Sequence, residues 1–254
     1  MRITTIINQK GGVGKTSTAH ALSTGLKHRG FKVLAVDVDP QGNLSYTIDA
    51  DTSGRGLYEA MCEETPTSEL IQTTPQCDTL PSTLLLSAAD MEFTNTGREW
   101  ILDNVLQPVK QHYDYIIIDS PPTLGILTVN ALTACNDVIV PMGTDIYSLQ
   151  GLNQLYATIG KVRKFCNRDI TIAGLLLTRY NGRSVLSRDI KSAIEAKAAE
   201  LNAPLYKTCI REAIAVKESQ TSKQSLFDYA PSATATQDYN KFINEYLAQE
   251  KGEK

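Results

Sequence analysis

The sequence predicts a single α/β domain, 1–254, built on a doubly wound, mainly parallel sheet with helices on both faces. Apolar runs rich in β-branched residues alternate with helix-length segments, as they do where crossover helices join parallel strands. Most of these runs are continuously apolar, which suits strands that are buried on both faces. The length of 254 residues is enough for one large domain with a substantial core, and no linker divides the chain.

Each expected element follows from this alternation. The stretch from about Gly42 to Pro81 is richer in Thr, Ser, Pro and Gly, so short helices and loops are expected there. The expected strands are Arg2–Asn8, Lys32–Asp37, Tyr113–Asp119, Asp137–Pro141, Thr171–Thr178 and Pro204–Ile210, with a further strand at Ser82–Ser87. The expected helices are Thr16–Arg29, Glu99–Val109, Leu124–Thr133, Leu149–Phe165 and Val185–Leu201.

A glycine-rich loop, Lys-Gly-Gly-Val-Gly-Lys-Thr-Ser, lies between the first expected strand and the first expected helix. Glycines let successive backbone N–H groups turn toward one anion, and the following helix N-terminus adds its dipole and unpaired N–H groups. Lys15 then supplies a fixed charge to the β- and γ-phosphates, and the Thr16 hydroxyl is expected to ligate Mg²⁺. We therefore predict an ATP and Mg²⁺ site, with loop contacts from Lys10, Gly11, Gly12, Val13, Gly14, Lys15, Thr16 and Ser17.

Two expected strands end in carboxylates. Period-two spacing puts Asp37 and Asp39 on the same face of one strand, and Asp119 ends another. Taken alone, two aspartates at a strand end are more often helix caps or turn residues. Beside a phosphate loop the functional interpretation is favoured, because both strand ends face that loop across the carboxyl edge of a parallel sheet. Asp119 stands where phosphate-loop NTPases place a magnesium-side acid.

The loop departs from the strict G-x-x-x-x-G-K-[ST] pattern, because Gln9 stands where the first glycine is required and Lys10 follows it. K-G-G-V-G-K-T resembles the deviant Walker A loop of the ParA/MinD class of ATPases. The D-x-D-P-Q-G-N segment that starts at Asp37, the L-T-x-Y strand end at Leu177–Tyr180 and the D-Y-x-P segment at Asp228–Pro231 extend this resemblance over essentially the full chain. The chain looks closest to the short, Soj-like ParA proteins of chromosome and plasmid partition.

This resemblance implies roles for individual residues. Lys10 would reach across a nucleotide-sandwich dimer to the partner's phosphates, and Asp39 would position or activate the attacking water. Asp37 would support the Mg²⁺ shell. The implied catalytic residues are therefore Lys10, Lys15 and Asp39, and the metal-side residues are Thr16, Asp37 and Asp119. The implied adenine contacts are Thr178, Ile210 and Glu212, although Ile210-Arg211-Glu212 stands where relatives have P-R-[ND].

The resemblance also implies partners. A homodimer formed with ATP would bind nonspecific DNA, and a ParB-like centromere-binding protein would stimulate a hydrolysis that is weak until then. The protein would be cytoplasmic and associated with the nucleoid. Two alternatives stay open: a ParA-like positioning ATPase for a non-DNA cargo, and a phosphate-loop metabolic ligase. A neighbouring gene for a small DNA-binding protein favours partition, and a carboxylated small-molecule product favours a ligase.

Charge distribution points to one segment for DNA. Net charge is −3, but residues 161–223 hold 13 Lys/Arg and 6 Asp/Glu, a net charge of +7. In Soj-like proteins one DNA-contacting arginine follows the L-T-x-Y strand end, and Arg183 takes that place. The position of a second holds Ile214, so nearby lysines are expected to supply the charge. The predicted DNA contacts are Arg183, Arg188, Lys191, Lys217 and Lys223.

Several other classes of protein are not indicated. Nothing resembles a signal peptide, and no apolar run approaches the roughly 20 residues of a membrane span, so no membrane partner is expected. The five cysteines are scattered and include no C-x-x-C pair, which argues against a metal cluster. The segment from Tyr239 to Leu247 has apolar residues at helical spacing and is expected to dock on the sheet. Its polar face lacks the basic bias of a membrane-surface helix, because it mixes Lys241, Glu245, Glu250 and Lys251.

Overall fold

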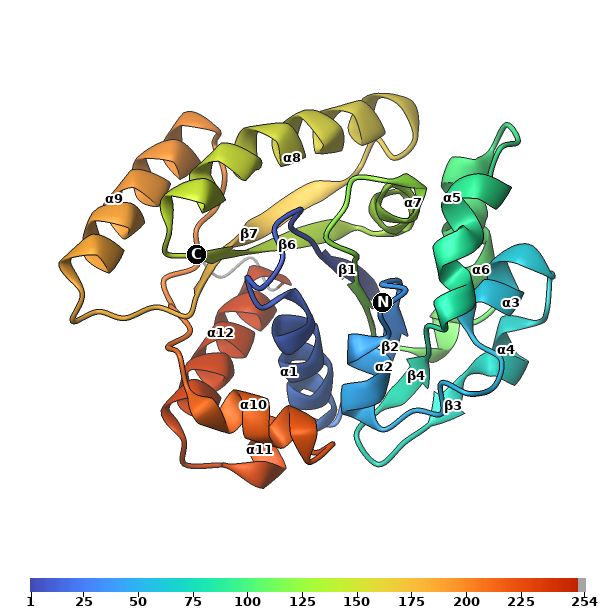
Figure 1. Ribbon diagram of the computed structural model, residues 1–254, viewed down its shortest axis with the longest axis horizontal. Helices are drawn as coiled ribbons and strands as arrows, with labels where there is room; N and C mark the ends of the chain where they lie inside the picture. Colours follow the sequence, from blue (N-terminus) through green and yellow to red (C-terminus); the bar gives the residue numbers. More distant parts are fainter. Residues whose placement is uncertain (251–254) are drawn as a thin grey trace.

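The structure, a computed structural model, describes residues 1–250. Its seven-stranded sheet has the order β3-β4-β2-β5-β1-β6-β7 (Figure 1). Neighbouring strands run parallel except β3 and β4, which are antiparallel. The predicted doubly wound, mainly parallel sheet is therefore confirmed. The strands are β1 (Arg2–Ile6), β2 (Val33–Asp37), β3 (Gln72–Thr73), β4 (Asp78–Leu80), β5 (Tyr115–Asp119), β6 (Asp137–Gly143) and β7 (Thr171–Thr178).

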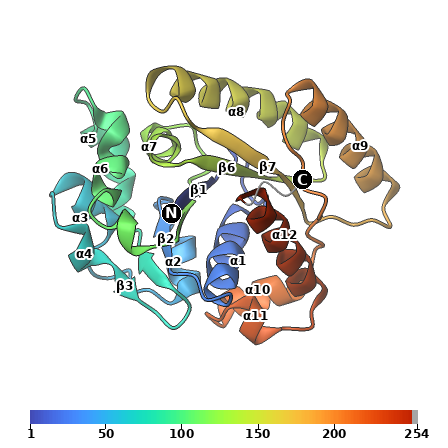
Figure 2. The same ribbon diagram turned by 180° about the vertical axis from the view of Figure 1, so that it is seen from behind.

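Helices cover both faces of the sheet (Figures 1 and 2). The α-helices are α1 (Lys15–Lys27), α2 (Asn43–Ile48), α3 (Leu57–Cys62), α4 (Thr67–Leu70), α5 (Ala89–Glu92), α6 (Ile101–Leu106), α7 (Ile126–Ala134), α8 (Ile146–Phe165), α9 (Val185–Glu200), α10 (Ile214–Thr221), α11 (Leu226–Tyr229) and α12 (Thr234–Glu250). Short 3₁₀ helices are η1 (Leu84–Ala88), η2 (Arg98–Trp100) and η3 (Lys110–His112).

Side-chain alternation along the central strands divides the core into two layers. On β1 and β5, Ile3 and Ile116 face the layer built by α6, α7, α8 and α9, while Ile6 and Ile117 face α1 and α12. Every residue of β2 and β5 is buried, which is why these strands read as continuous apolar runs in the sequence. Because β1, β2 and β5 are parallel neighbours in register, their carboxyl ends meet at one edge of the sheet.

Two expected strands are wrong. Ser82–Ser87 contains no strand, and η1 (Leu84–Ala88) occupies most of it, after the short β4 has ended ahead of Pro81. Pro204–Ile210 runs beside β7 and exchanges backbone hydrogen bonds with it, but it forms one isolated bridge, Leu205 with Leu175, instead of a ladder. Its first residue is a proline, which has no N–H to donate.

The stretch from Gly42 to Pro81 is partly as expected. It contains the short helices α2, α3 and α4, but also the strands β3 and β4, which were not predicted from the sequence. At the other end of the chain, α12 is docked as predicted: Phe242 and Tyr246 are fully buried, and the Tyr246 hydroxyl lies 2.7 Å from that of Thr4. The Glu250 side chain and Lys251 lie outside what the structure describes. Within residues 1–250, every helix is too short or too polar to cross a membrane.

Candidate functional site

The glycine-rich loop lies at the carboxyl edge of the sheet, between β1 and α1. Gly12 and Gly14 have φ angles of 73° and 82°, in the left-handed region that favours glycine. The Thr178 hydroxyl, at the end of β7, donates to the Val13 carbonyl at 2.8 Å. The loop is therefore shaped by its glycines and anchored to the far strand of the sheet.

Helix α1 begins with backbone donors turned toward this loop. Gly14 is its N-cap and provides no side-chain cap, and the first N–H groups of a helix have no partner within it. The Lys15 side chain is buried, and its ammonium group donates to the Lys10 carbonyl at 3.2 Å. Burial lowers the pKa of Lys15, while the charges of Asp119 and Asp39 oppose that shift. A cation beside an open helix N-terminus is suited to bind a phosphate chain.

The carboxylates of Asp37 and Asp119 end neighbouring strands as register partners, and both are buried. Asp37 accepts hydrogen bonds from the Ser45 N–H at 2.8 Å, the Ser45 hydroxyl at 2.7 Å and the Asp39 N–H at 3.2 Å. Burial raises the pKa of Asp37 to about 6 despite these bonds. The pKa of Asp119 is raised well above its ordinary value, first by burial and then by the charge of Asp37.

The oxygens of Asp119 fit a divalent cation. Both are buried without a hydrogen-bond partner of normal geometry, and a looser contact with the Thr16 side chain offsets the pKa shift in part. Buried polar atoms in this condition are costly unless a bound group satisfies them. Within residues 1–250, no three His, Cys, Asp or Glu side chains are grouped to hold a metal by themselves. This donor set suits Mg²⁺, which takes one or two carboxylates together with phosphate oxygens.

Lys10 is held by a carboxylate of the same chain. Its ammonium group forms an ion pair with Asp145, in the segment between β6 and α8. Asp145 also accepts hydrogen bonds from the N–H and the hydroxyl of Ser148, each at 3.2 Å. Burial opposes ionisation of Asp145, but Lys10 and Ser148 together lower its pKa. In this conformation Lys10 is therefore engaged within its own chain.

An open cavity of about 680 Å³ connects the loop with the segment after β7. The predicted adenine contacts Thr178, Ile210 and Glu212 all line it, so the structure brings them together beside the phosphate loop. Arg179 donates to the Gly12 carbonyl at 3.2 Å and forms an ion pair with Glu212 at 3.0 Å. The volume suits a nucleotide, since ligand cavities of this class measure roughly 300–1,000 Å³.

Apart from Lys10, the predicted residues on the phosphate and metal side divide into two groups. Gly11, Gly12, Gly14, Lys15, Thr16, Ser17 and Asp39 line the cavity. The Val13 side chain is buried, as are the carboxylates of Asp37 and Asp119.

Three residues that contact the phosphate loop were not predicted as site residues from the sequence. Arg179 occupies the variable position of the matched L-T-x-Y segment, so the motif gave it no role. Its positive charge was the one feature of the sequence that could have pointed to a phosphate-side residue. Gln220, on the unpredicted helix α10, donates to the Ser17 hydroxyl at 3.1 Å. Asp145 had no local signal, because its pairing with Lys10 depends on two segments 135 residues apart.

The first group of predicted DNA contacts lies on and before α9. Arg183 is exposed, and Arg188 donates to the carbonyls of Gly182 at 3.0 Å and Arg183 at 3.4 Å. Lys191 forms an ion pair with Glu195 at 3.8 Å, one helical turn later. The cations of this group are thus clustered where β7 gives way to α9.

The second group lies on and after α10. Lys217 lines the nucleotide-side cavity. Lys223 forms an ion pair with Asp49 at 2.7 Å, and its ammonium group lies 4.9 Å from the centre of the Tyr46 ring. The charge of Lys223 is therefore partly neutralised within the chain.

Comparisons with known proteins agree with this geometry. Residues 1–172 match the family model described as an AAA domain. The chain is similar to the sporulation initiation inhibitor protein Soj of Bacillus subtilis, at 36% identity over 252 residues, covering 97% of this chain and 98% of that protein. It is similar to the chromosome partitioning protein ParA of Caulobacter vibrioides, at 34% identity, covering 99% and 96%. A solved structure of cobyrinic acid a,c-diamide synthase from Mycobacterium smegmatis, with bound ADP and magnesium, has a TM-score of 0.88 at 29% identity, covering 100% and 96%.

Proposed function

Because the chain belongs to the Soj/ParA family of partitioning ATPases, we propose that it is a DNA-partitioning switch that hydrolyses ATP to ADP and phosphate with Mg²⁺. One observation carries the proposal. The buried cation Lys15 and the open N-terminus of α1 lie beside Asp119, whose two buried oxygens lack hydrogen-bond partners of normal geometry. A phosphate chain would pair with Lys15 and the N–H groups of α1, and a divalent cation attached to it would pair with the oxygens of Asp119.

Each residue has a distinct task in the proposed reaction. Loop N–H groups and Lys15 hold the phosphates, and Thr16, Asp37 and Asp119 serve the metal side. Magnesium, when bound, neutralises charge that develops on the phosphate oxygens. Asp39 lines the cavity, and its Oδ1 accepts the Gln41 N–H at 3.0 Å, which fixes the carboxylate where it can orient a water.

In the proposed cycle, the ion pair of Lys10 with Asp145 breaks when the ATP-bound dimer forms. A second copy that brings its phosphates to Lys10 must compete with Asp145 for the same ammonium group. ATP-bound dimers then form when the phosphate chain offers more negative charge than one carboxylate does. ADP, with one phosphate fewer, competes less well, so hydrolysis favours the monomer.

The proposed cycle has two partners. The dimer binds nonspecific DNA through Arg183, Arg188, Lys191, Lys217 and Lys223, because two copies double the number of phosphate contacts. A ParB-like centromere-binding protein raises a slow basal hydrolysis and releases the dimer. On the same grounds we place the protein in the cytoplasm, associated with the nucleoid. The support is the names of its relatives and the basic segment of residues 161–223.

Light scattering of an Asp39→Ala variant tests the switch. We expect monomer mass without nucleotide and with ADP, and a doubled mass with ATP and Mg²⁺. A Lys10→Ala change in the same background should return the mass to that of the monomer. Unchanged mass with ATP contradicts the sandwich dimer.

A phosphate-loop ligase is the second candidate, since a solved structure at 29% identity is named a diamide synthase. Product analysis separates the two. A switch yields ADP and phosphate from ATP and water alone, whereas a ligase couples turnover to consumption of a small-molecule acid. ATP turnover that requires such an acid rejects the switch.

A further inference from the structure

Helix α10, which lies beside α2 and α11 (Figure 1), has little apolar surface packed into the core. Among its eight residues Ser219 is buried, and Ala215 and Val216 pack on the core in part. Ile214, at its first position, is 72% exposed. An element with so few buried apolar contacts has low local stability, so its position depends on individual polar contacts.

The carboxyl end of α10 is anchored to α1 and α2. Lys223, two residues after the helix, has a φ angle of 50°, in the left-handed region where a non-glycine residue is uncommon. Its ammonium group pairs with Asp49 at 2.7 Å, and its carbonyl accepts from the Gln76 side chain at 3.1 Å. Gln76 also donates to the Thr47 carbonyl of α2 at 2.8 Å and lies 2.6 Å from the His20 ring of α1. This end of the helix is therefore fixed by several contacts.

The cavity side of α10 is joined to the phosphate loop by one hydrogen bond. The Gln220 side chain donates to the Ser17 hydroxyl at 3.1 Å, and both residues line the nucleotide-side cavity. A hydroxyl that accepts one hydrogen bond keeps its own proton for donation. Because Ser17 lines the cavity, that proton is available to a phosphate oxygen bound there.

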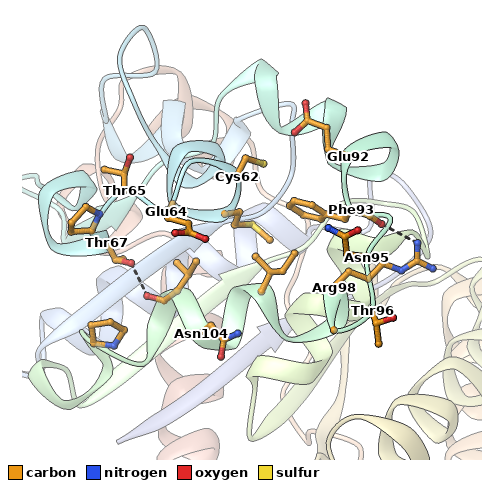
Figure 3. Close-up of a pocket in the computed structure, with 17 residues that line it drawn as sticks. Cys62, Glu64, Thr65, Thr67, Glu92, Phe93, Asn95, Thr96, Arg98 and Asn104 are labelled. Carbon is orange, nitrogen blue, oxygen red and sulfur yellow. Dashed lines mark hydrogen bonds between the residues drawn. The ribbon is translucent and has the colours of Figure 1, made fainter.

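A separate cavity of about 660 Å³ lies beside α3, α5 and α6 (Figure 3). Its charged lining residues, Glu64, Glu92 and Arg98, carry both signs and so indicate no particular ligand. The residues that line it lie between 60 and 108, outside α1, α2 and α10. The exposed amide of Asn104 in this cavity therefore provides a control that is remote from α10.

We propose that Gln220 is a positioning residue that orients the Ser17 hydroxyl toward a bound nucleotide and thereby fixes α10 at the filled site. Two hydrogen bonds in series through one hydroxyl polarise each other, so a phosphate that accepts from Ser17 strengthens the bond from Gln220. The inference rests on the proposed contact between Ser17 and nucleotide. It makes the position of Lys217, on the same helix, depend on whether nucleotide is bound.

Amide hydrogen exchange of the full-length protein tests this coupling. ADP with Mg²⁺ is the probe, because the proposed dimer requires ATP and a second copy then cannot protect α10. At saturating ADP we expect exchange in residues 214–223 to slow by about tenfold in wild type and by much less in Gln220→Ala. The readout needs no dimer, DNA or hydrolysis, so its failure is distinguishable from failure of the proposed function. Unchanged exchange of this segment in wild type, or equal protection in Gln220→Ala, overturns the proposal.

Binding of a fluorescent ADP analogue measures the hydrogen bond itself. Gln220→Ala should weaken binding roughly three- to tenfold, as expected for the loss of one hydrogen bond. Gln220→Glu keeps the size of the side chain but cannot donate, so it should bind at least as weakly. Gln224→Ala, the same change at an exposed position after α10, and Asn104→Ala should bind normally.

A double-mutant cycle separates the proposed relay from independent packing. Ser17→Ala with Gln220→Ala should bind ADP no more weakly than Ser17→Ala alone, because both changes interrupt the same pair of hydrogen bonds. Losses that add in the double variant, or wild-type affinity of Gln220→Glu, overturn the proposal.

Discussion

Asp119 and Lys15 are ionisable groups that the fold buries close to each other, and both have pKa values shifted by that burial. Burying such groups costs desolvation free energy, unless opposite charges and hydrogen bonds offset that cost. Asp37 adds a third buried ionisable group at the same strand ends. Clusters of this kind are typical of functional sites, where a ligand supplies the missing compensation.

Two substitutions separate binding from hydrolysis. Lys15→Ala removes the fixed charge of the loop, so ATP binding should fall below detection at micromolar protein. Asp39→Ala removes a group that orients water but holds no phosphate, so ATP should still bind while hydrolysis falls by about a hundredfold or more. Equilibrium binding of a fluorescent ATP analogue and phosphate release measure the two effects. Wild-type turnover by Asp39→Ala contradicts the role given to that residue.

Stability should depend on pH through Asp37. Its pKa rises from 3.8 to about 6 on folding, so the folded state binds this proton more tightly than the unfolded state. Its contribution to stability is therefore present at low pH and is lost as pH rises from about 4 through about 6. Without nucleotide and metal, Asp37→Asn should gain about 1–3 kcal/mol relative to wild type between pH 4 and pH 8. Urea unfolding measures this difference, and the exposed Asp169→Asn is the control; a pH-independent difference contradicts the assignment.

The phosphate loop could be predicted from sequence because its chemistry is local: glycines, lysine and threonine stand next to one another. Asp37 and Asp119 followed from the rule that parallel strand ends share an edge. Asp145 and Arg179 could not be found in this way. Their partners, Lys10 and Glu212, are brought to them by tertiary packing, which residue spacing does not encode.

At the level of elements, buried parallel strands were the easiest to predict, since β7 (Thr171–Thr178) agrees with the sequence to the residue. Short apolar runs were the hardest. Ser82–Ser87 reads as a strand by composition, but a run of this length has no periodicity that separates strand from helix. In the structure Leu84 and Leu85 are largely exposed, and Leu86 is the leucine of this run that packs into the core. The strands β3 and β4 are two and three residues long, too short to carry a pattern.

Docking of α12 should contribute strongly to stability. Phe242 is fully buried, and its ring lies 4.9 Å from that of Tyr206 in an edge-to-face arrangement. Phe242→Ala should lower the free energy of unfolding by about 3–5 kcal/mol, the usual cost of such a cavity. Urea unfolding without nucleotide measures it, with the exposed Lys241→Ala as the control on the same helix. A loss below about 1 kcal/mol would mean that α12 is not packed as described.

Across the whole molecule, the sheet order separates charge. Residues 57–108 lie at the β3 and β4 edge with net negative charge. Of the segment 161–223, which has a net charge of +7, β7 and α9 lie at the opposite edge, whereas α10 packs beside α2 (Figure 1). This polarity predicts an orientation on DNA in which the β7 end faces the phosphates. The overall net charge of −3 hides that property, because the two segments nearly cancel.

DNA binding by this basic end should be independent of sequence, dependent on ATP and steeply dependent on salt. Phosphate contacts carry no base information, and each one releases counterions, so the slope of log affinity against log salt counts them. Arg183→Ala with Lys217→Ala should reduce that slope by roughly 0.9 for every DNA phosphate that a protomer no longer neutralises. Filter binding across a salt series, with Lys32→Ala and Lys241→Ala as an exposed control pair outside the segment, measures the change. ATP matters because dimerisation joins two basic ends on one duplex. Equal affinity with and without ATP, or equal slopes for the double variant and the control pair, would place the DNA surface elsewhere on the molecule.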